Sequence, residues 1–501
     1  MLLTERYRDQ IRGVLSCYDR LIILGTLPSL GYAEGMTLFL KKHQIRIFDY
    51  ARFAEPLRDA IRSNAEQMAQ QQGVAIEFVR KTDFRKEKRI AEVLRQRGQQ
   101  PGLVHILSAM EVCPTYKPWH DKRTGKTFLK GDLSKCLHYY FYFIDEELGL
   151  LFVRVPTWCP FRMQFYFNGH NLLAAKLAAQ HIKYQLLDNV FIEIDDLQKA
   201  QELADDLDIP RLHRKLDEYA QRCCPVLKTL ELSYHWSLMQ TEYATDIIFK
   251  QQTDLALRYD ALVRTAVHTV KPDHIATFLG RKFTNNYQDE MGNRFSTRLE
   301  GTCVKHHMGP VVIKMYDKLR LVLRIETAAN KPSFFKHHRW VEQKNGQRVF
   351  KLAPLKRSIY SLSDLVKLMR AANQRYLDFI SELDDPSAGR KLLNKVCEPK
   401  KQQGRSYKGL NFFHAADQKL IETLARGEFT ICGFRNKDLR RLLPPMNTAQ
   451  ISRRLKCLRL HGLIRRVGRT YKYYLSKRGR QVIITGLKLK ELFLVPHLAL
   501  A

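Results

Sequence analysis

The segment NTAQISRRLKCLRLHG, residues 447–462, decides the fold of the C-terminal part of the chain. Asn447 or Thr448 can cap the start of a helix, and Gly462 can close it after His461. Apolar residues recur at helical spacing, so one face of this helix can pack into a core; they are Ile451, Leu455, Leu458 and Leu460. The basic residues between them are predicted to point outward and bind nucleic acid; they are Arg453, Arg454, Lys456 and Arg459.

The elements expected around this helix extend the pattern. Helices are expected at residues 416–426 and 434–443, and β segments at 463–467 and 471–475. Three helices followed by a β-hairpin are the order of a winged helix-turn-helix. The hairpin adds four candidate nucleic-acid contacts, which are Arg465, Arg466, Arg469 and Lys472.

The charge of the chain supports a polyanionic partner. The 501 residues contain 84 Lys and Arg against 51 Asp and Glu, a formal net charge of +33. Residues 387–501 alone hold 26 basic and 6 acidic residues. Cationic side chains that face phosphates give strong, salt-sensitive affinity. Duplex DNA is the expected partner, and structured RNA is the alternative, because winged helices bind either.

Two resemblances extend this interpretation. Residues 451–455 and 461–464 resemble the MarR-like winged-helix modules of bacterial regulators, which implies a third helix in the major groove and a wing on the backbone or minor groove. The whole chain resembles a large uncharacterised bacterial family associated with mobile DNA. That second resemblance is carried by residues 48–50, 135–141, 234–237 and 433–436, and it implies a mobile-element setting.

The N-terminal part alternates apolar runs with amphipathic stretches over residues 14–113. Strands are expected at 21–24, 45–48, 74–79 and 103–107, and helices at 53–72 and 86–97. This alternation predicts a mostly parallel sheet covered by helices.

The fold class expected for the chain is therefore α/β and multidomain. A strand–helix alternating N-terminal domain precedes a central α+β region and the C-terminal winged helix-turn-helix. The expected boundaries are an α/β domain at 1–130, an aromatic hairpin with a helical region at 131–290, a basic β-rich region at 291–383, a linker at 384–411 and the winged-helix domain at 412–501.

A first candidate catalytic group lies in residues 230–250, where a helix is expected. His235, Glu242 and Asp246 would then share one helical face. Two carboxylates one turn apart could hold Mg²⁺ or Mn²⁺ for phosphodiester hydrolysis. The alternative is that both carboxylates form ordinary surface ion pairs.

Asp19 and Glu111 are further candidate metal ligands, since they lie at the first and fourth expected strands. Acidic residues at adjacent strand ends could join the helix carboxylates in an RNase H-like site. The expected β-α-β-α-β order departs from the three-stranded meander that opens that nuclease fold. Capping and surface roles are the alternatives for both residues.

Tyr316 is a candidate nucleophile. The pattern Tyr316-Asp317-Lys318, followed by Leu-Arg-Ile-Glu at 323–326, is similar to strand pairs in some phage and plasmid replication initiators. That resemblance implies a tyrosine that attacks DNA while carboxylates hold a metal. The His-hydrophobic-His motif of such initiators is absent from the sequence. The alternative role for Tyr316 is an ordinary strand aromatic.

Basic and aromatic residues also gather at 334–339, beside a hairpin expected around Asn345-Gly346. Lys336 and Arg339 are candidate phosphate contacts, and the neighbouring aromatics could stack on unpaired bases.

Composition narrows the remaining possibilities. No run of about 18 apolar residues is present, so no membrane helix is expected. The ten cysteines form no C-x-x-C pair, which favours reduced thiols in a cytoplasmic protein. Three functions stay open: a DNA-binding protein without chemistry, a metal-dependent nuclease, transposase or replication initiator, and a structured-RNA-binding protein. The oligomeric state does not follow from the sequence.

Overall fold

The computed structural model divides into two compact units, residues 1–384 and residues 385–501. It describes residues 2–80, 84–98, 100–281, 289–298, 301–383, 386–426, 428–429, 433–443, 446–468, 470–488, 490 and 495. No helix among these residues is both long and apolar enough to cross a membrane.

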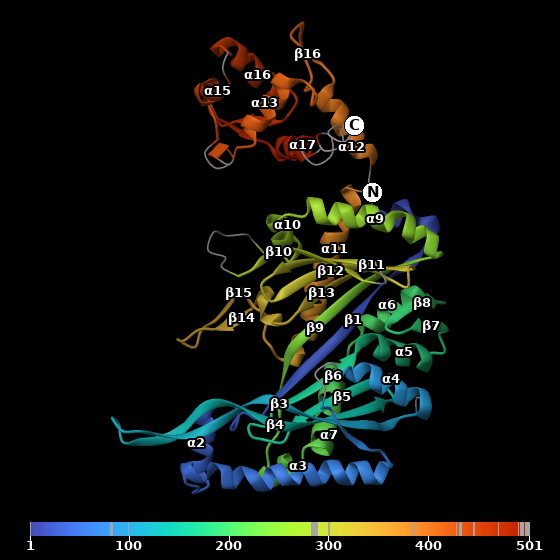
Figure 1. Ribbon diagram of the computed structural model, residues 1–501, viewed down its shortest axis with the longest axis vertical. Coiled ribbons are helices and arrows are strands. Elements are labelled where there is room, and N and C mark those ends of the chain that lie inside the picture. Colours follow the sequence, from blue (N-terminus) through green and yellow to red (C-terminus); the bar gives the residue numbers. More distant parts are fainter. Residues whose placement is uncertain are drawn as a thin grey trace. The chain divides into compact units, whose positions relative to one another are not determined.

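One large mixed sheet organises unit 1 (Figure 1). Its strands lie in the order β10 (Met291–Arg298), β11 (Gly301–Met308), β12 (Val311–Lys318), β13 (Val322–Ala329), β9 (His235–Phe249), β1 (Ile11–Thr26), β6 (Met163–Asn168), β5 (Gly149–Pro156), β4 (Lys126–Asp145), β3 (Gly102–Asp121) and β2 (Ile76–Phe78). Strands from residues 1–130, 131–290 and 291–383 all pair into this sheet, so the three expected N-terminal regions share one structural element.

The α/β fold class is confirmed, but the expected parallel sheet is wrong. Among the strand pairs of this sheet that the structure describes, only β2 and β3 pair in parallel, and the others are antiparallel. Most neighbouring strands are joined by tight turns rather than by the helical crossovers that parallel pairing requires. The strand expected at 45–48 is instead part of a short 3₁₀ helix, η2 (Ile47–Asp49).

Residues 235–249 form the strand β9, within the segment 230–250 where a helix was expected. The second half of β9, from Thr241 to Phe249, is buried on both faces. A strand buried on both faces reads as one continuous apolar run, without the alternation that identifies a half-exposed strand. Glu242 and Asp246 still share a face, because a spacing of four also fits the two-residue period of a strand.

Helices cover both faces of the sheet. In unit 1 they are α1 (Leu3–Arg6), α2 (Ala33–Lys42), α3 (Tyr50–Gln72), α4 (Lys86–Arg97), α5 (Gly169–Ala179), α6 (Leu197–Asp205), α7 (Ile209–Cys223), α8 (Val226–Leu230), α9 (Gln252–Thr269), α10 (Pro272–Phe278) and α11 (Leu362–Leu383). The helices expected at 53–72 and 86–97 are confirmed as α3 and α4.

Two helical layers enclose the central strands. Helix α11 packs against β9 and β13, where Asn373 donates to the Tyr243 carbonyl. Helices α5 and α6 pack on β1 around Leu15, on the opposite face. The first residue of α5, Gly169, lies so close to β1 that a Cβ there would be 2.2 Å from the Tyr18 carbonyl oxygen. Glycine at this position therefore lets α5 begin directly over β1.

Two small hairpins complete unit 1. Strands β7 (Tyr184–Leu187) and β8 (Val190–Ile194) pair beside α5, and strands β14 (Lys336–Glu342) and β15 (Arg348–Pro354) pair as a separate two-stranded sheet. Short 3₁₀ helices flank the second hairpin, η3 (Pro332–Phe334) and η4 (Ile359–Ser361).

Unit 2 has the expected order of helices and strands. Its elements are α12 (Pro386–Cys397), β16 (Lys400–Gln402), β17 (Arg405–Tyr407), α13 (Ala415–Leu424), α15 (Asn436–Leu442), α16 (Thr448–Leu460), β18 (Ile464–Arg466), β19 (Tyr473–Leu475) and α17 (Lys477–Lys488). Asn447 caps α16 by accepting from the Gln450 backbone N–H at 2.9 Å, as expected. Residues 384–411, expected as a linker, contain α12 and the hairpin β16–β17.

Candidate functional site

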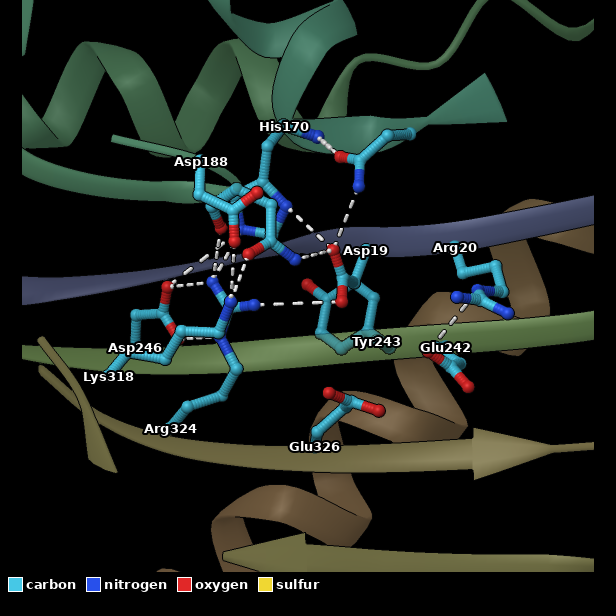
Figure 2. A network of polar contacts seen from close by, with 12 residues as sticks. Asp19, Arg20, His170, Asp188, Glu242, Tyr243, Asp246, Lys318, Arg324 and Glu326 are labelled. Carbon is cyan, nitrogen blue, oxygen red and sulfur yellow. Dashed lines mark hydrogen bonds and ion pairs between the residues drawn. The ribbon is translucent and has the colours of Figure 1, made fainter. Parts of the chain in front are cut away.

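Five polar side chains gather on one face of four neighbouring strands. Asp19 comes from β1, Glu242 from β9, Glu326 from β13, and Lys314 and Tyr316 from β12. The register explains the gathering, because Glu326 pairs with Ala244 of β9 and with Lys314 of β12. Residues two apart on a strand share a face, so Glu242 points the same way as Ala244. Figure 2 shows Asp19, Glu242 and Glu326 on these adjacent strands.

Asp19, Glu242 and Glu326 form a carboxylate triad. One oxygen from each lies within 4.8 Å of the other two. It is the one group of three or more His, Cys, Asp or Glu side chains with this spacing in the part of the chain that the structure describes. All three residues are buried, and Glu326 is only 1% exposed. Converging carboxylate oxygens are the ligands of Mg²⁺ and Mn²⁺, so the triad fits a divalent cation.

Lys314 lies between two members of the triad. Its Nζ is 2.5 Å from Glu326 Oε1 and 3.4 Å from Glu242 Oε1. Burial favours the neutral amine, but the charges of Glu326 and Glu242 outweigh burial and raise the pKa of Lys314. Burial and the Glu326 charge raise the pKa of Glu242. The triad therefore still favours additional positive charge.

Tyr316 is attached to the triad through its hydroxyl, which donates a hydrogen bond to Glu326 Oε2. Burial and the charge of Glu326 raise the pKa of Tyr316 well above its ordinary value. The phenol is therefore protonated in this arrangement. Activation of Tyr316 as a nucleophile requires a base or a cation beside it, and the triad offers a place for both.

Asp246 does not join the triad, contrary to the prediction that it holds a metal with Glu242. Arg324 Nε and a terminal nitrogen of Arg324 donate to its two oxygens at 2.6 and 2.7 Å. Burial favours the neutral acid, but the Arg324 charge outweighs burial and holds the pKa of Asp246 below its ordinary value. Both residues are buried, and Arg324 is 0% exposed. Asp246 is thus the structural partner of Arg324.

Asp19 is oriented by neighbours from other elements. Asn168 and Asn189 donate to its Oδ1 at 3.0 and 2.7 Å, and His170 Nδ1 lies 3.3 Å from the same oxygen. Its Oδ2 faces an Arg324 nitrogen at 3.6 Å, beyond hydrogen-bonding distance. Figure 2 shows these contacts around Asp19. One oxygen is therefore held by the protein, and the other is directed toward the space near Arg324 and the triad.

Glu111 lies away from the triad, which corrects its prediction as a shared metal ligand. It belongs to β3, and β6, β5 and β4 separate that strand from β1. Its carboxylate accepts from Tyr140 and Arg154, both at 2.6 Å, and from Lys86 at 3.0 Å. Burial favours the neutral acid, but hydrogen bonds from Tyr140 and Arg154 outweigh it and lower the pKa of Glu111 to about 2.

Sequence reasoning did not name Glu326, Arg324, Lys314 or His170 as site residues, although Arg324 and Glu326 lie within the quoted pattern at 323–326. Glu326 and Arg324 stand out in β13 because they are charged residues in an otherwise apolar buried strand, which is a usable signal. Lys314 alternates with the buried Ile313 and Met315, as a strand predicts. His170 carries no such signal, because only the packing of α5 on β1 brings it to Asp19.

The residues of unit 2 predicted to contact nucleic acid differ in exposure and in their contacts. Arg453, Arg459, Arg465 and Arg466 have exposed side chains, and the Arg466 side chain donates to the Thr470 carbonyl. Lys456 lies 5.0 Å from the Tyr407 ring, and Lys472 lies 5.6 Å from the Tyr474 ring. Arg469 lies outside the described residues.

Arg454 is a correction to the outward face predicted for α16. One of its terminal nitrogens donates to Asp417 Oδ1 at 2.6 Å, and Asp417 is 1% exposed. A buried carboxylate needs a partner of opposite charge. Arg454 therefore supports the packing of α16 on α13. In unit 1, Lys336 is exposed and Arg339 is half-buried on β14.

Replacement of Arg324 tests the buried ion pair. Arg324→Met leaves Asp246 without its charged partner, so we expect the free energy of unfolding to fall by about 3–5 kcal/mol. Urea denaturation of the full chain measures this change. Arg58→Met is the control, because its ion pair with Asp59 is exposed, and it should change stability little. Equal effects of the two variants would contradict the structural role of Arg324.

Comparisons with known proteins identify no family for this chain. No family model and no curated protein matches. A rolling-circle replication initiator from Geobacillus stearothermophilus is 8% identical, with 72% of this chain and 97% of that chain covered and a TM-score of 0.19. A class II 3-hydroxy-3-methylglutaryl-CoA reductase from Streptococcus pneumoniae is 9% identical, with 89% and 78% covered and a TM-score of 0.16. At these TM-scores neither likeness defines a shared fold.

Proposed function

We propose that this protein binds DNA and cleaves one strand of it at the triad, with Tyr316 as the nucleophile. The observation that carries the proposal is the buried group of Asp19, Glu242 and Glu326, whose oxygens lie within 4.8 Å of one another, with the Tyr316 hydroxyl on Glu326. A site for a divalent cation beside a phenol that is hydrogen-bonded to a carboxylate is suited to phosphodiester chemistry.

The proposed step is a transfer of the phosphoryl group to tyrosine. Glu326 accepts the proton of the Tyr316 hydroxyl, and the phenolate oxygen attacks phosphorus. The bond from phosphorus to one sugar oxygen breaks, and that oxygen takes up a proton from water. Lys314 and Arg20, both partly exposed, can offset negative charge on the phosphate oxygens. A divalent cation in the triad would supply further charge neutralisation.

In the same proposal, unit 2 is a winged helix of the MarR-like kind that holds duplex DNA, in a protein of mobile-element type. The order α13, α15, α16 and β18–β19 supports this role, as does the excess of 26 basic over 6 acidic residues in 387–501. Exposed Arg453 on α16 and Arg465 on β18 are the proposed contacts.

Removal of the Tyr316 hydroxyl tests the cleavage step. Tyr316→Phe should abolish nicking of supercoiled plasmid in Mg²⁺ or Mn²⁺ and should abolish the covalent protein–DNA adduct seen after denaturing electrophoresis. Tyr243→Phe is the matched control, because Tyr243 is a buried tyrosine on β9 that contacts Arg370 on the opposite face of the sheet. If the wild-type protein cleaves no DNA, the proposed cleavage is wrong. If Tyr316→Phe keeps full activity, Tyr316 is not the nucleophile.

The raised pKa of Glu242 predicts how metal binding depends on pH. Protonation of Glu242 competes with the cation, so Mn²⁺ affinity should fall as the pH falls through a value above the ordinary 4.5 of glutamate. Titration calorimetry at several pH values measures this. Glu242→Gln should weaken Mn²⁺ binding at neutral pH by ~10-fold or more. Glu111→Gln, a carboxylate paired with Arg154, should leave it unchanged, and the same loss in both variants would contradict the site.

Arginine replacement in unit 2 tests duplex binding. Arg453→Ala with Arg465→Ala should weaken affinity for duplex DNA and reduce the dependence of log affinity on log salt by about 2, since two phosphate contacts are lost. Fluorescence anisotropy over a range of salt concentrations measures both. Arg426→Ala, whose side chain pairs with Glu428, is the control. If both the affinity and the salt dependence stay unchanged, Arg453 and Arg465 do not contact duplex DNA.

A further inference from the structure

The hairpin β14–β15, called here the ribbon, stands apart from the large sheet. Its strands, Lys336–Glu342 and Arg348–Pro354, form a separate two-stranded sheet. Figure 1 shows the ribbon projecting away from the strands β9 and β13. An isolated two-stranded hairpin gains little stability from its own contacts. The stability of the ribbon therefore depends on how its base is attached to the rest of unit 1.

The base of the ribbon is anchored in the core of unit 1. Phe335 and Leu355, the residues that flank it, are each 2% exposed and belong to the main hydrophobic cluster. The Leu355 backbone N–H donates to the Phe335 carbonyl at 2.9 Å. Farther out, the ribbon lacks such cover, since every residue from Glu342 to Leu352 is exposed. The ribbon is thus fixed to the core at its base and exposed to solvent over its outer part.

One face of the ribbon is apolar and aromatic. Trp340 pairs with Phe350 and His338 pairs with Leu352, so these four side chains share a face. Trp340 is 63% exposed, Phe350 57% and Leu352 56%. The ring centroids of Trp340 and Phe350 are 5.5 Å apart, and His338 stacks on Phe350 at 5.9 Å. Exposed apolar side chains that cluster on one face in this way form a candidate binding surface.

Positive charge surrounds this aromatic face. Residues 336–357 contain one acidic residue, Glu342, and seven basic residues, which are Lys336, Arg339, Lys344, Arg348, Lys351, Lys356 and Arg357. Lysine is depleted in protein–protein interfaces, whereas cations beside aromatic rings are typical of surfaces that bind single-stranded nucleic acid. The charges complement phosphates, and the rings complement the faces of bases.

The ribbon is connected to both strands that carry the glutamates of the triad. The chain passes from Glu326 on β13 to the start of the ribbon within ten residues. After the ribbon, the Arg357 carbonyl accepts from the Leu238 backbone N–H at 2.5 Å. Leu238 lies on β9, four residues before Glu242, a distance of about 13 Å along a strand. The base of the ribbon is therefore joined to the strands of the triad, and Trp340, five residues beyond Phe335, lies about 17 Å farther out along β14.

We propose that the ribbon binds single-stranded DNA beside the cleavage site, with unpaired bases stacked on Trp340 and Phe350. Base faces in a duplex are already stacked on one another, so these side chains find free base faces only where DNA is unpaired. The choice of DNA rests on the proposed function of the triad. The stacking surface itself rests on the exposure and charge of the ribbon.

Loss of both aromatic rings tests the inference in the full-length protein. Trp340→Ala with Phe350→Ala should weaken binding of a fluorescein-labelled oligo-dT by ~10-fold or more, measured by anisotropy in EDTA so that no strand is cut. Raised salt concentration reduces the contribution of phosphate contacts elsewhere. Affinity for duplex DNA should stay unchanged. Phe48→Ala is the matched control, because Phe48 is 65% exposed but lies on η2, away from the ribbon.

Removal of the bases gives a second measurement of the same contact. An abasic strand should bind the wild-type protein as weakly as oligo-dT binds the double variant, and the double variant should show no further loss with the abasic strand. If the double variant binds oligo-dT as tightly as the wild type, the inference is wrong. If the double variant loses duplex binding to the same extent, the ribbon binds a groove of duplex DNA and does not stack on unpaired bases.

The outcomes for the two proposals are separable. A protein whose ribbon variant loses oligo-dT binding but which never cuts DNA would refute the tyrosine chemistry and leave the ribbon in place. If the wild-type protein cuts DNA and the ribbon variant binds oligo-dT normally, only the proposed role of the ribbon is wrong. Tyr243→Phe should bind oligo-dT as the wild type does, because Tyr243 contacts Arg370 on the face of the sheet opposite the triad.

Discussion

The buried charge of Arg324 is the constraint on which the centre of unit 1 depends. Its guanidinium donates to Asp246 on β9 and to the Asn189 carbonyl beside β8, and it faces Asp19 on β1 at 3.6 Å. A buried cation is stable only while its partners stay in place. Arg324 therefore fixes β13, β9 and β1 relative to one another. The separation of the carboxylates on these three strands follows from that arrangement.

The same arrangement divides the carboxylates into two kinds. Both oxygens of Asp246 are paired with Arg324, whereas Glu242 and Glu326 share one half-buried ammonium group, that of Lys314. Lys314 lies closer to Glu326 than to Glu242, and burial together with the Glu326 charge raises the pKa of Glu242. A cation placed among the triad would relieve that repulsion. The structure thus supports a metal at the triad more strongly than at Asp246.

Local signals in the sequence predicted part of this structure, and long-range partners account for the rest. Helices α3 and α16 were predictable because apolar spacing and the Asn447 cap are local. Strand β9 was not, because burial on both faces hides its alternation. Asp246 and Glu111 were misassigned for one reason. Each is neutralised by an arginine from a strand far away in the sequence, Arg324 or Arg154.

Under the proposed function, the depth of the site argues for an unpaired substrate strand. Glu326 is 1% exposed and Tyr316 is half-buried, so a phosphate must come down to the sheet to reach them. The phosphates of a duplex are carried on a stiff double helix, whereas a single strand bends freely at each nucleotide. A surface that separates or holds unpaired bases next to the triad then becomes a requirement of the chemistry. In that proposal, the aromatic face of the ribbon, whose base bonds to β9, meets this requirement independently of unit 2.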